Sequence, residues 1–331
     1  MKYKDVLGID VSKKTIDVLL HSTKAHYIFN NNCNGYKSLI TWLRKQTILD
    51  VSEILICFEN TGLYSLPLAM YLCKNKVIYV MVPALEIKRS LGLVRGKNDK
   101  IDASRIAEYA FLRKDQLKPF ELPSKNIMVL QKLISLRVRI VKQRAGFLGG
   151  LKEYKAMLKQ KDYELLFETH KKMIHYLGKQ ITIIENEIIE LINNDPKMKG
   201  IYDLITSVKG VGPVLASNLL VVTNCFMSFK DSRKFACYAG LAPFEKQSGT
   251  SLKSKSRVSH FANKKIKSLL NLAASSAIQA DPELKAYYHR RVNSGKSKMS
   301  TLNIVRNKIV HRVFAVVKRG TPYVPLHLHV A

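Results

Sequence analysis

The stretch between residues 124 and 193 contains no proline and carries a regular spacing of apolar side chains. These side chains recur at alternating intervals of three and four residues, which is the pattern of a coiled-coil seam. The seam consists of Ile174, Leu177, Ile181, Ile184, Ile188 and Leu191, and a weaker one of Val129, Leu133, Leu136, Ile140 and Phe147. We therefore expect residues 121–197 to form two long helices that pair with each other or with another subunit. For the weaker seam, an amphipathic helix packed on a globular core explains the pattern equally well.

Residues 1–120 alternate between short apolar runs typical of strands and longer segments with helical spacing. Strands are expected at 4–9, 15–21, 26–30, 52–58 and 77–82, and helices at 35–44 and 62–73. Only turns separate the first strands, whereas helices separate the later ones. This order predicts an α/β domain in which helices cover a mixed sheet.

Residues 198–331 form a third region, which is predicted to be mostly helical. Residues 208–216 read Val-Lys-Gly-Val-Gly-Pro-Val-Leu-Ala, which has the form of a helix-hairpin-helix. Its glycines permit a tight turn and let the following helix approach a phosphate closely. A loop rich in Ser, Lys and Gly is expected over residues 245–259, with helices around 262–280 and 301–318.

The charge of the chain indicates which class of partner it binds. Its 331 residues include 55 Lys or Arg and 25 Asp or Glu, a formal net charge of +30. From Lys246 onward there are 17 basic and two acidic residues, so half of the excess lies in the last quarter of the chain. Such an excess favours polyanions, with nucleic acid first and an anionic membrane surface second.

Other features of the composition exclude several protein classes. No apolar run approaches the ~18 residues that span a bilayer, and the amino terminus does not have the pattern of a secretory signal. The five cysteines are scattered without a CxxC pair. This scatter argues against a disulfide framework or a zinc site and fits a reducing cytoplasm. We expect a folded cytoplasmic protein with no membrane partner.

Four acidic residues are placed where carboxylates are unusual. Asp10 ends the first expected strand, Glu59 follows the strand at 52–58, and Asp99 and Asp102 would share one face of a helix. If the strands are adjacent, these groups converge as hard oxygen ligands suited to Mg²⁺. Taken singly, each acid is more simply a turn residue or helix cap, or, for Asp102, a surface partner of Arg105.

Three acidic motifs resemble those of the insertion sequence one-ten family of transposases. They read Gly8-Ile-Asp-Val-Ser-Lys13, Phe58-Glu-Asn-Thr-Gly62 and Asn98-Asp-Lys-Ile-Asp-Ala103. Further along, residues 207–216, residues 235–243, Ser248-Gly249 and Asn263-Lys264-Lys265 resemble the family's helix-hairpin-helix element and transposase domain. The resemblance extends over nearly the whole chain, and the combination is far more specific than any single motif.

This resemblance implies a RuvC-like (RNase H-like) domain over residues 1–120, in which Asp10, Glu59, Asp99 and Asp102 form a metal-binding tetrad for Mg²⁺ or Mn²⁺. It implies that Ser248 is the nucleophile of a transposase domain over residues 198–331. The implied partners are DNA at the element ends and target, a structured guide RNA, and further copies of the chain in a dimer or tetramer. Lysines follow Asn263 where relatives commonly have arginine, and lysine lacks the planar guanidinium fork.

Without the resemblance, little in the sequence distinguishes Ser248 as a nucleophile. It lies in a polar, glycine-containing segment, and Ser251, Ser254 and Ser256 are close competitors. A serine in such a segment is more often a turn residue or a phosphate contact. An unactivated hydroxyl is a weak nucleophile that needs a base or a metal, and no histidine is adjacent to Ser248 in sequence. Activation by metal on the distant carboxylates is therefore the more economical hypothesis.

The carboxy-terminal basic residues are candidate nucleic-acid contacts. The predicted contacts are Lys253, Lys255, Arg257, Asn263, Lys264, Lys265, Arg290, Arg291, Lys296 and Lys298. Tyr287 lies among them, and basic residues interleaved with aromatic ones suit phosphate contacts and stacking on unpaired bases. Arg306 and Arg312 extend the basic run, in which no acid follows Glu283. We expect this run to lack ion-pair partners and to face nucleic acid.

The function predicted from these features is that of a DNA transposase, with metal-dependent strand exchange through a phosphoserine intermediate and guidance by RNA. One alternative is a RuvC-like nuclease or junction resolvase, in which water attacks and Ser248 only contacts a phosphate. A second is a DNA invertase of the pilin-inversion type. A third is a non-catalytic nucleic-acid-binding protein in which the acids are helix caps.

Overall fold

Five strands form one mixed sheet in the order β3-β2-β1-β4-β5. They are β1 (Asp5–Val11), β2 (Thr15–Leu20), β3 (His26–Asn30), β4 (Ile54–Glu59) and β5 (Tyr79–Val82). The pairs β1–β2 and β2–β3 are antiparallel, whereas β4 pairs in parallel with β1 and β5. Tight turns allow the antiparallel pairs, while the intervening helices carry the chain back for the parallel ones. The predicted mixed sheet is confirmed.

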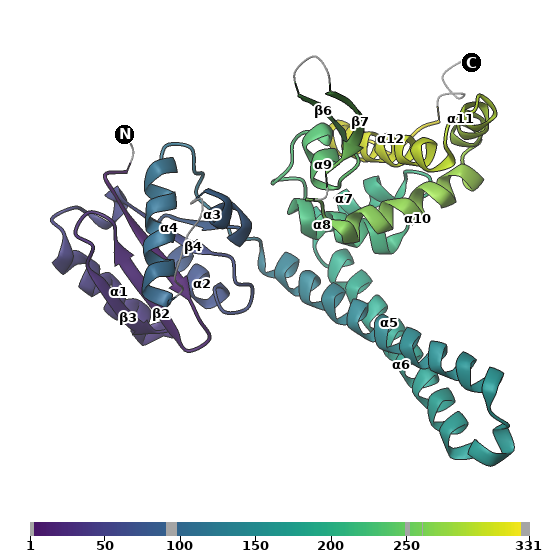
Figure 1. Ribbon diagram of the computed structural model, residues 1–331, viewed down its shortest axis with the longest axis horizontal. Helices are drawn as coiled ribbons and strands as arrows, with labels where there is room; N and C mark the ends of the chain where they lie inside the picture. Colours follow the sequence, from purple (N-terminus) through teal and green to yellow (C-terminus); the bar gives the residue numbers. More distant parts are fainter. Residues whose placement is uncertain (1–2, 91–97, 249–251, 260, 326–331) are drawn as a thin grey trace. The chain divides into compact units, whose positions relative to one another are not determined.

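The computed structural model describes residues 3–90, 98–248, 252–259 and 261–325. Two compact units divide the chain, one over 1–122 and the other over 123–331 (Figure 1). The second unit contains the coiled-coil helices together with the carboxy-terminal helices. A separate boundary near residue 198 stays a prediction. No helix in the described ranges is long and apolar enough to cross a membrane.

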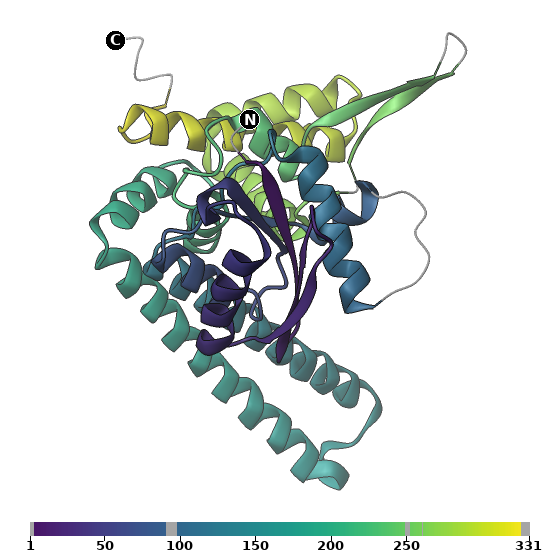
Figure 2. The same cartoon turned by 90° about the vertical axis from the view of Figure 1, so that its left-hand side faces the viewer.

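Helices cover both faces of the sheet. One face packs on α1 (Cys33–Gln46) and α2 (Leu66–Lys74), and the other packs on α3 (Ala84–Ser90) and α4 (Asp99–Arg113). Figure 2 shows α1 and α4 on opposite sides of the strands. Because side chains alternate along a strand, Leu7 and Ile9 face the α1 side while Val6 faces the α4 side.

The two long helices of the second unit pair with each other. They are α5 (Lys125–Met157) and α6 (Glu164–Asn193), which run side by side in Figure 1. The seam predicted on α6 is buried at Leu177, Ile184 and Ile188. The weaker seam predicted on α5 is wrong at its start, since Val129 and Leu136 are 39% and 37% exposed.

At the start of α5, the buried residues are shifted by one position along the chain from the predicted seam. Ile127, Leu130 and Ile134 are buried there, because this part of α5 packs against α8 as well as α6. A helix that packs against two other helices buries a wider face than the single stripe of a coiled-coil seam. The coiled-coil pattern was therefore predictive on α6. On α5 it was wrong at Val129 and Leu136, whereas Leu133 and Ile140 pack against the core and Phe147 contacts the His170 ring of α6.

A bundle of helices completes the second unit. Its elements are α7 (Pro196–Thr206), α8 (Pro213–Thr223), α9 (Ser232–Tyr238), α10 (Lys264–Ala280), α11 (Pro282–Asn293) and α12 (Lys298–Arg319). The turn between α7 and α8 is the predicted hairpin, and Gly210 adopts φ +87° there. A Cβ at Gly210 would lie 2.5 Å from the carbonyl oxygen of Ala273, so this turn packs directly on α10.

The loop expected over residues 245–259 is wrong, because most of this segment forms a β-hairpin. Strand β6 (Pro243–Ser248) pairs with β7 (Leu252–Val258) in antiparallel register. The register shifts between Phe244 and Lys246. Polar composition concealed the strands, because backbone pairing forms a two-stranded ribbon and the sequence of this segment carries no alternation of apolar and polar residues.

Candidate metal centre

The sheet brings two of the predicted carboxylates together. Strands β1 and β4 are parallel neighbours, and Ile9 pairs with Phe58, so Asp10 and Glu59 take the next matched positions. Val6 and Leu55 face α4, and Asp10 and Glu59 each lie four residues beyond them on the same face. Both acidic residues are half-buried at the carboxyl ends of their strands.

Helix α4 supplies the other two carboxylates. Asn98 caps this helix by accepting a hydrogen bond from the Ile101 N–H at 2.7 Å, so Asp99 and Asp102 lie in the first turn. The helix that the i, i+3 spacing required is therefore present. An acidic first turn also suits the positive end of the helix dipole.

A glycine sets how closely α4 approaches the sheet. A Cβ placed on Gly8 would lie 2.4 Å from both the Ala103 carbonyl oxygen and the Ala107 backbone nitrogen. These distances are too short for any side chain, so only glycine lets the α4 backbone rest on β1 at this point. Gly8 and Asp10 lie on the same face of β1, and the contact therefore brings the first turn of α4 towards Asp10.

Asp10 lies near the negative charges of the other three carboxylates. Burial, together with the negative charges of Asp102, Asp99 and Glu59, raises the pKa of the Asp10 carboxyl to about 6. Like charges destabilise the ionised form when they lie close together in a partly buried site. The convergence of all four residues in one metal site stays a prediction.

The residues fit a divalent cation in their chemistry. Carboxylate oxygens are the hard ligands that Mg²⁺ and Mn²⁺ prefer, and a cation relieves the repulsion around Asp10. Within the described ranges, no three histidine, cysteine, aspartate or glutamate side chains lie close enough together to hold a metal ion. The Asp102 carboxylate instead accepts a hydrogen bond from Arg105 Nη1 at 2.7 Å. Metal binding by these four residues stays a prediction.

A fifth carboxylate was missed by sequence reasoning. Asp17 lies directly opposite Asp10 in the β1–β2 ladder, is 4% exposed and adds to the rise in the pKa of Asp10. Its Oδ1 lies 3.0 Å from His26 Nε2, which provides a partner for the buried charge. An acidic residue at an inward-facing position of an otherwise apolar strand was the signal that could have identified it.

The Gly8→Ala substitution tests how α4 is positioned. The added methyl group must push α4 away from β1, and we expect the free energy of unfolding to fall by about 3 kcal/mol. Asp99 and Asp102 move away from Asp10 at the same time, so DNA cleavage should fall even where the variant remains folded. Chemical denaturation and a cleavage assay measure the two effects.

Gly146→Ala is the matched control, because a Cβ on this α5 residue meets nothing within 4 Å. Alanine favours a helix interior over glycine by about 0.5–1 kcal/mol, so the control should be slightly stabilised. Wild-type stability in Gly8→Ala would contradict the close contact between α4 and β1.

Ser248 belongs to the second unit. It is the last residue of β6 and pairs with Leu252 at the start of β7, while residues 249–251 lie outside the described ranges. Lys253, Lys255 and Arg257 belong to β7. The predicted nucleophile thus lies at the end of a hairpin rather than inside a long loop, and its role stays a prediction.

The remaining predicted nucleic-acid contacts lie at two places, the start of α10 and the turn between α11 and α12. Asn263 caps α10 by accepting from the Ile266 N–H at 3.1 Å and donates to the Tyr238 hydroxyl at 2.8 Å, so its amide already has partners within the chain. Lys264 and Lys265 open the same helix. Four more of the predicted contact residues lie on either side of the turn between α11 and α12, namely Arg290, Arg291, Lys296 and Lys298.

Two arginines of the basic run turn inward, which the sequence-based expectation did not foresee. Arg312 forms ion pairs with Asp281 at 2.6 Å and Glu283 at 2.5 Å. Arg306 is 5% exposed and donates hydrogen bonds to Asn303 and Asn271. The two acids that precede the basic run are therefore partners of Arg312, although they are distant from it in sequence.

The mixed sheet and the acidic residues on β1, β4 and α4 define the class of this protein as one with an RNase H-like DEDD domain. Residues 7–159 match a family model described as a transposase, the DEDD type of IS110, and residues 202–289 match the "Transposase IS116/IS110/IS902 family". The two matches together cover well over half of the chain, in the predicted order. The chain belongs to the IS116/IS110/IS902 family of transposases.

Individual relatives agree with this assignment. The pilin gene-inverting proteins of Moraxella lacunata and Moraxella bovis are each 27% identical to this chain, over 97% of its length and 98% of theirs. An insertion element IS110 protein of Streptomyces coelicolor is 32% identical over 140 residues, which are 42% of this chain and 33% of that protein. Family membership implies an enzyme of transposition that binds DNA, and the DEDD domain implies dependence on a divalent metal in general.

Proposed function

We propose that this transposase cuts and rejoins DNA through a covalent bond between Ser248 and a DNA phosphate, with Asp10, Glu59, Asp99 and Asp102 holding Mg²⁺ or Mn²⁺. The observation that carries the proposal is the placement of half-buried Asp10 among other carboxylates, where burial and then the neighbouring negative charges raise its pKa to about 6. A basic protein has little reason to concentrate negative charge in one half-buried region unless a cation binds there.

A divalent cation bound at such carboxylates supplies positive charge that favours deprotonation of an attacking hydroxyl and stabilises a leaving oxygen. The Ser248 Oγ forms a bond to phosphorus as the bond from phosphorus to the 3′ oxygen of the DNA breaks. The serine proton leaves to solvent, and the 3′ oxygen takes up a proton to become a hydroxyl. In the second step, that 3′-hydroxyl attacks the phosphoserine of a partner strand, which restores the serine and joins the strands.

The proposal extends to three partners. DNA supplies the element ends and the target, and a structured RNA guides their choice, as in the transposases that this chain resembles. The net charge of +30 supports binding of either polyanion. Strand exchange needs two cleaved sites at once, so we expect a dimer or tetramer in solution.

The test is to trap the covalent product. The full chain is incubated with Mg²⁺, labelled DNA carrying the element ends and transcribed flanking RNA, and then denatured before electrophoresis. We expect a labelled band at the combined mass of the protein and the attached DNA strand, which chelation by EDTA abolishes. Cleavage without any adduct would instead favour the nuclease in which water attacks, and absence of cleavage in every combination would favour a binding protein.

Site-specific DNA inversion is the second candidate function. It is favoured by the likeness to the pilin gene-inverting proteins, which extends over almost the full length of both chains. Both functions use the same residues and differ in the arrangement of the recombined sites. A plasmid that carries two sites separates them, because inversion retains the intervening DNA in reversed orientation whereas transposition moves the element elsewhere.

A further inference from the structure

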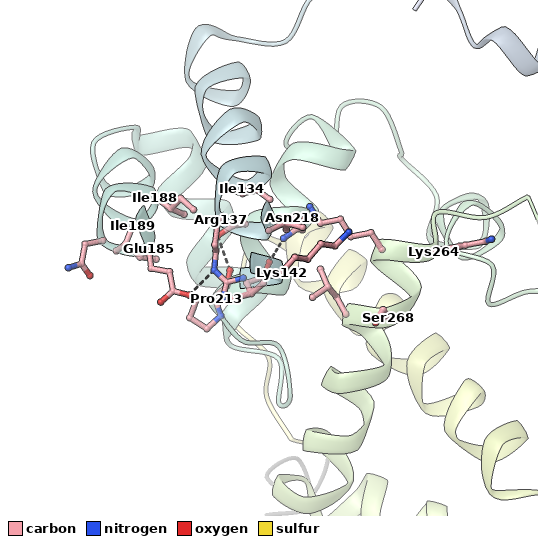
Figure 3. Close-up of a pocket in the computed structure, with 16 residues that line it drawn as sticks. Ile134, Arg137, Lys142, Glu185, Ile188, Ile189, Pro213, Asn218, Lys264 and Ser268 are labelled. Atoms are coloured by element: carbon pink, nitrogen blue, oxygen red, sulfur yellow. Dashed lines mark hydrogen bonds and ion pairs between the residues drawn. The ribbon is translucent and has the colours of Figure 1, made fainter. Parts of the chain in front are cut away.

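A cavity of about 670 Å³ opens among four helices of the second unit (Figure 3). Helices α5, α6, α8 and α10 each contribute residues to its lining. The volume falls within the range of about 300–1,000 Å³ that is typical of sites for small ligands. It shares no residue with the carboxylate region, which belongs to the other unit.

The walls of this pocket are mainly aliphatic, and its charged groups are nearly all positive. The aliphatic lining consists of Ile134, Val138, Ile188, Ile189, Val214 and Leu269. Four cations accompany it, namely Arg137, Lys142, Lys264 and Lys265. Glu185 is the one acid among the lining residues, and its Oε1 already accepts a bond from Arg137 Nε at 2.7 Å. The pocket therefore offers an apolar surface beside an excess of positive charge.

The positive charges lie close enough to affect one another. Burial lowers the pKa of the Lys265 ammonium, and the nearby guanidinium of Arg137 lowers it further. A bound anion would relieve this repulsion, because an opposite charge favours the protonated lysine. The ligand that complements the pocket is therefore anionic at one end and apolar at the other.

Polar groups on α8 lie within the same pocket and can orient a ligand. Asn218 is 4% exposed, and its Nδ2 donates to the Val214 carbonyl at 2.7 Å. This bond fixes the amide against the pocket wall, where Figure 3 shows it beside Lys142 and Pro213. A side-chain amide combines donors and an acceptor, as the edge of a nucleobase does.

We propose that this pocket binds a single unpaired nucleotide, whose base packs against the aliphatic wall while its phosphate contacts the cations. A nucleotide has the required polarity, because a flat base with apolar faces is linked to an anionic phosphate. The family to which the chain belongs acts on nucleic acid, so such a ligand is always available. The inference deepens the proposed function at Lys264 and Lys265, and it depends neither on the carboxylates nor on Ser248.

The test compares two duplexes that differ by one base. Each duplex is fluorescently labelled and has one bulged position, which carries a normal nucleotide in one and an abasic sugar in the other, so the phosphates are equal in number. Binding to the full chain is measured by fluorescence anisotropy in EDTA at fixed salt, which keeps catalysis out of the result. We expect the base to strengthen binding about tenfold through the apolar surface it buries.

Variants that fill the pocket locate the effect. Val138→Trp on α5 and Ile189→Trp on α6 place bulk in the cavity from two walls without changing its charge. Both should remove the tenfold advantage of the base and leave binding to the abasic duplex unchanged. Val129→Trp and Ile183→Trp are the controls on the same helices, where the native side chains are 39% and 57% exposed, and both should keep the advantage.

DNA and RNA versions of the two duplexes distinguish the source of the nucleotide. A preference for the base in either version supports the pocket and identifies the nucleic acid that enters it. Equal affinity of the wild-type chain for normal and abasic bulges in both versions would overturn the proposal. It would also be overturned if the control variants lost the preference as fully as the filled ones. Circular dichroism of each variant verifies that it is folded.

Discussion

Replacing Ser248 with alanine is expected to reduce the covalent protein–DNA adduct by at least about 10³-fold, because the substitution removes the only atom that the proposed reaction links to phosphorus. The serine is the last residue of β6, where its backbone pairs with Leu252. Alanine is compatible with that backbone, so the hairpin and DNA binding should be preserved. The measurement is the labelled adduct after denaturation, together with anisotropy of DNA binding.

Ser254→Ala is the matched control for this experiment. Ser254 lies in the facing strand β7, opposite Lys246, and is one of the serines that compete with Ser248 for the role of nucleophile. The control should form the adduct at the wild-type level. If Ser248→Ala still forms the adduct, the nucleophile has been assigned to the wrong residue. If it cleaves DNA without an adduct, water is the attacking group and the chain acts as a nuclease.

The second large effect is expected at Asp10, where Asp10→Asn should lower strand cleavage about 10³-fold. An amide oxygen is a weaker ligand than a carboxylate, and the loss corresponds to about 4 kcal/mol of transition-state stabilisation. Asp10 is the carboxylate on which the charges of Asp102, Asp99 and Glu59 converge, so its removal affects the whole group. Single-turnover cleavage with excess Mg²⁺ measures the change in rate.

The same variant should be more stable than the wild type in metal-free buffer. The pKa of Asp10 is 3.8 in a model peptide and about 6 in the folded protein. Between these values the folded state binds more protons than the unfolded state, so wild-type stability falls as pH rises through this window. The full loss is at most about 3 kcal/mol, and asparagine avoids it because it does not ionise. Asp10→Asn should therefore gain stability above pH 6, and this gain should disappear below about pH 4.

Added Mg²⁺ should reverse the order of stability. A ligand that binds only the folded state stabilises it, so Mg²⁺ should raise the wild-type melting temperature and have little effect on Asp10→Asn. Asp50→Asn is the control, because Asp50 caps a short helix elsewhere in the unit and asparagine caps equally well. Identical pH profiles for the wild type and Asp10→Asn between pH 4 and 7 would contradict the raised pKa of Asp10, and with it the burial and the neighbouring charges that cause it.

The local patterns of the sequence predicted the elements of the fold well. Apolar runs predicted the five strands of the sheet, and the seam through Leu177 and Ile184 predicted the long helix α6. These patterns are reliable because burial on one side of a strand or helix imposes its own period on the chain. The hairpin of β6 and β7 was missed because it carries no such period.

The sequence by itself determined which residue types were available for chemistry, namely four acids at the ends of predicted elements and a basic carboxy-terminal quarter. The tertiary structure decided which of them meet. Gly8 lets α4 lie directly on β1, Asp17 joins Asp10 from the neighbouring strand, and Arg312 finds its partners about thirty residues away. The residues that line the proposed nucleotide pocket come from four helices, so the pocket cannot be predicted from the sequence of any one of them. Periodicity reports only the immediate surroundings of each residue, whereas a site is made by contacts between residues that are distant in sequence.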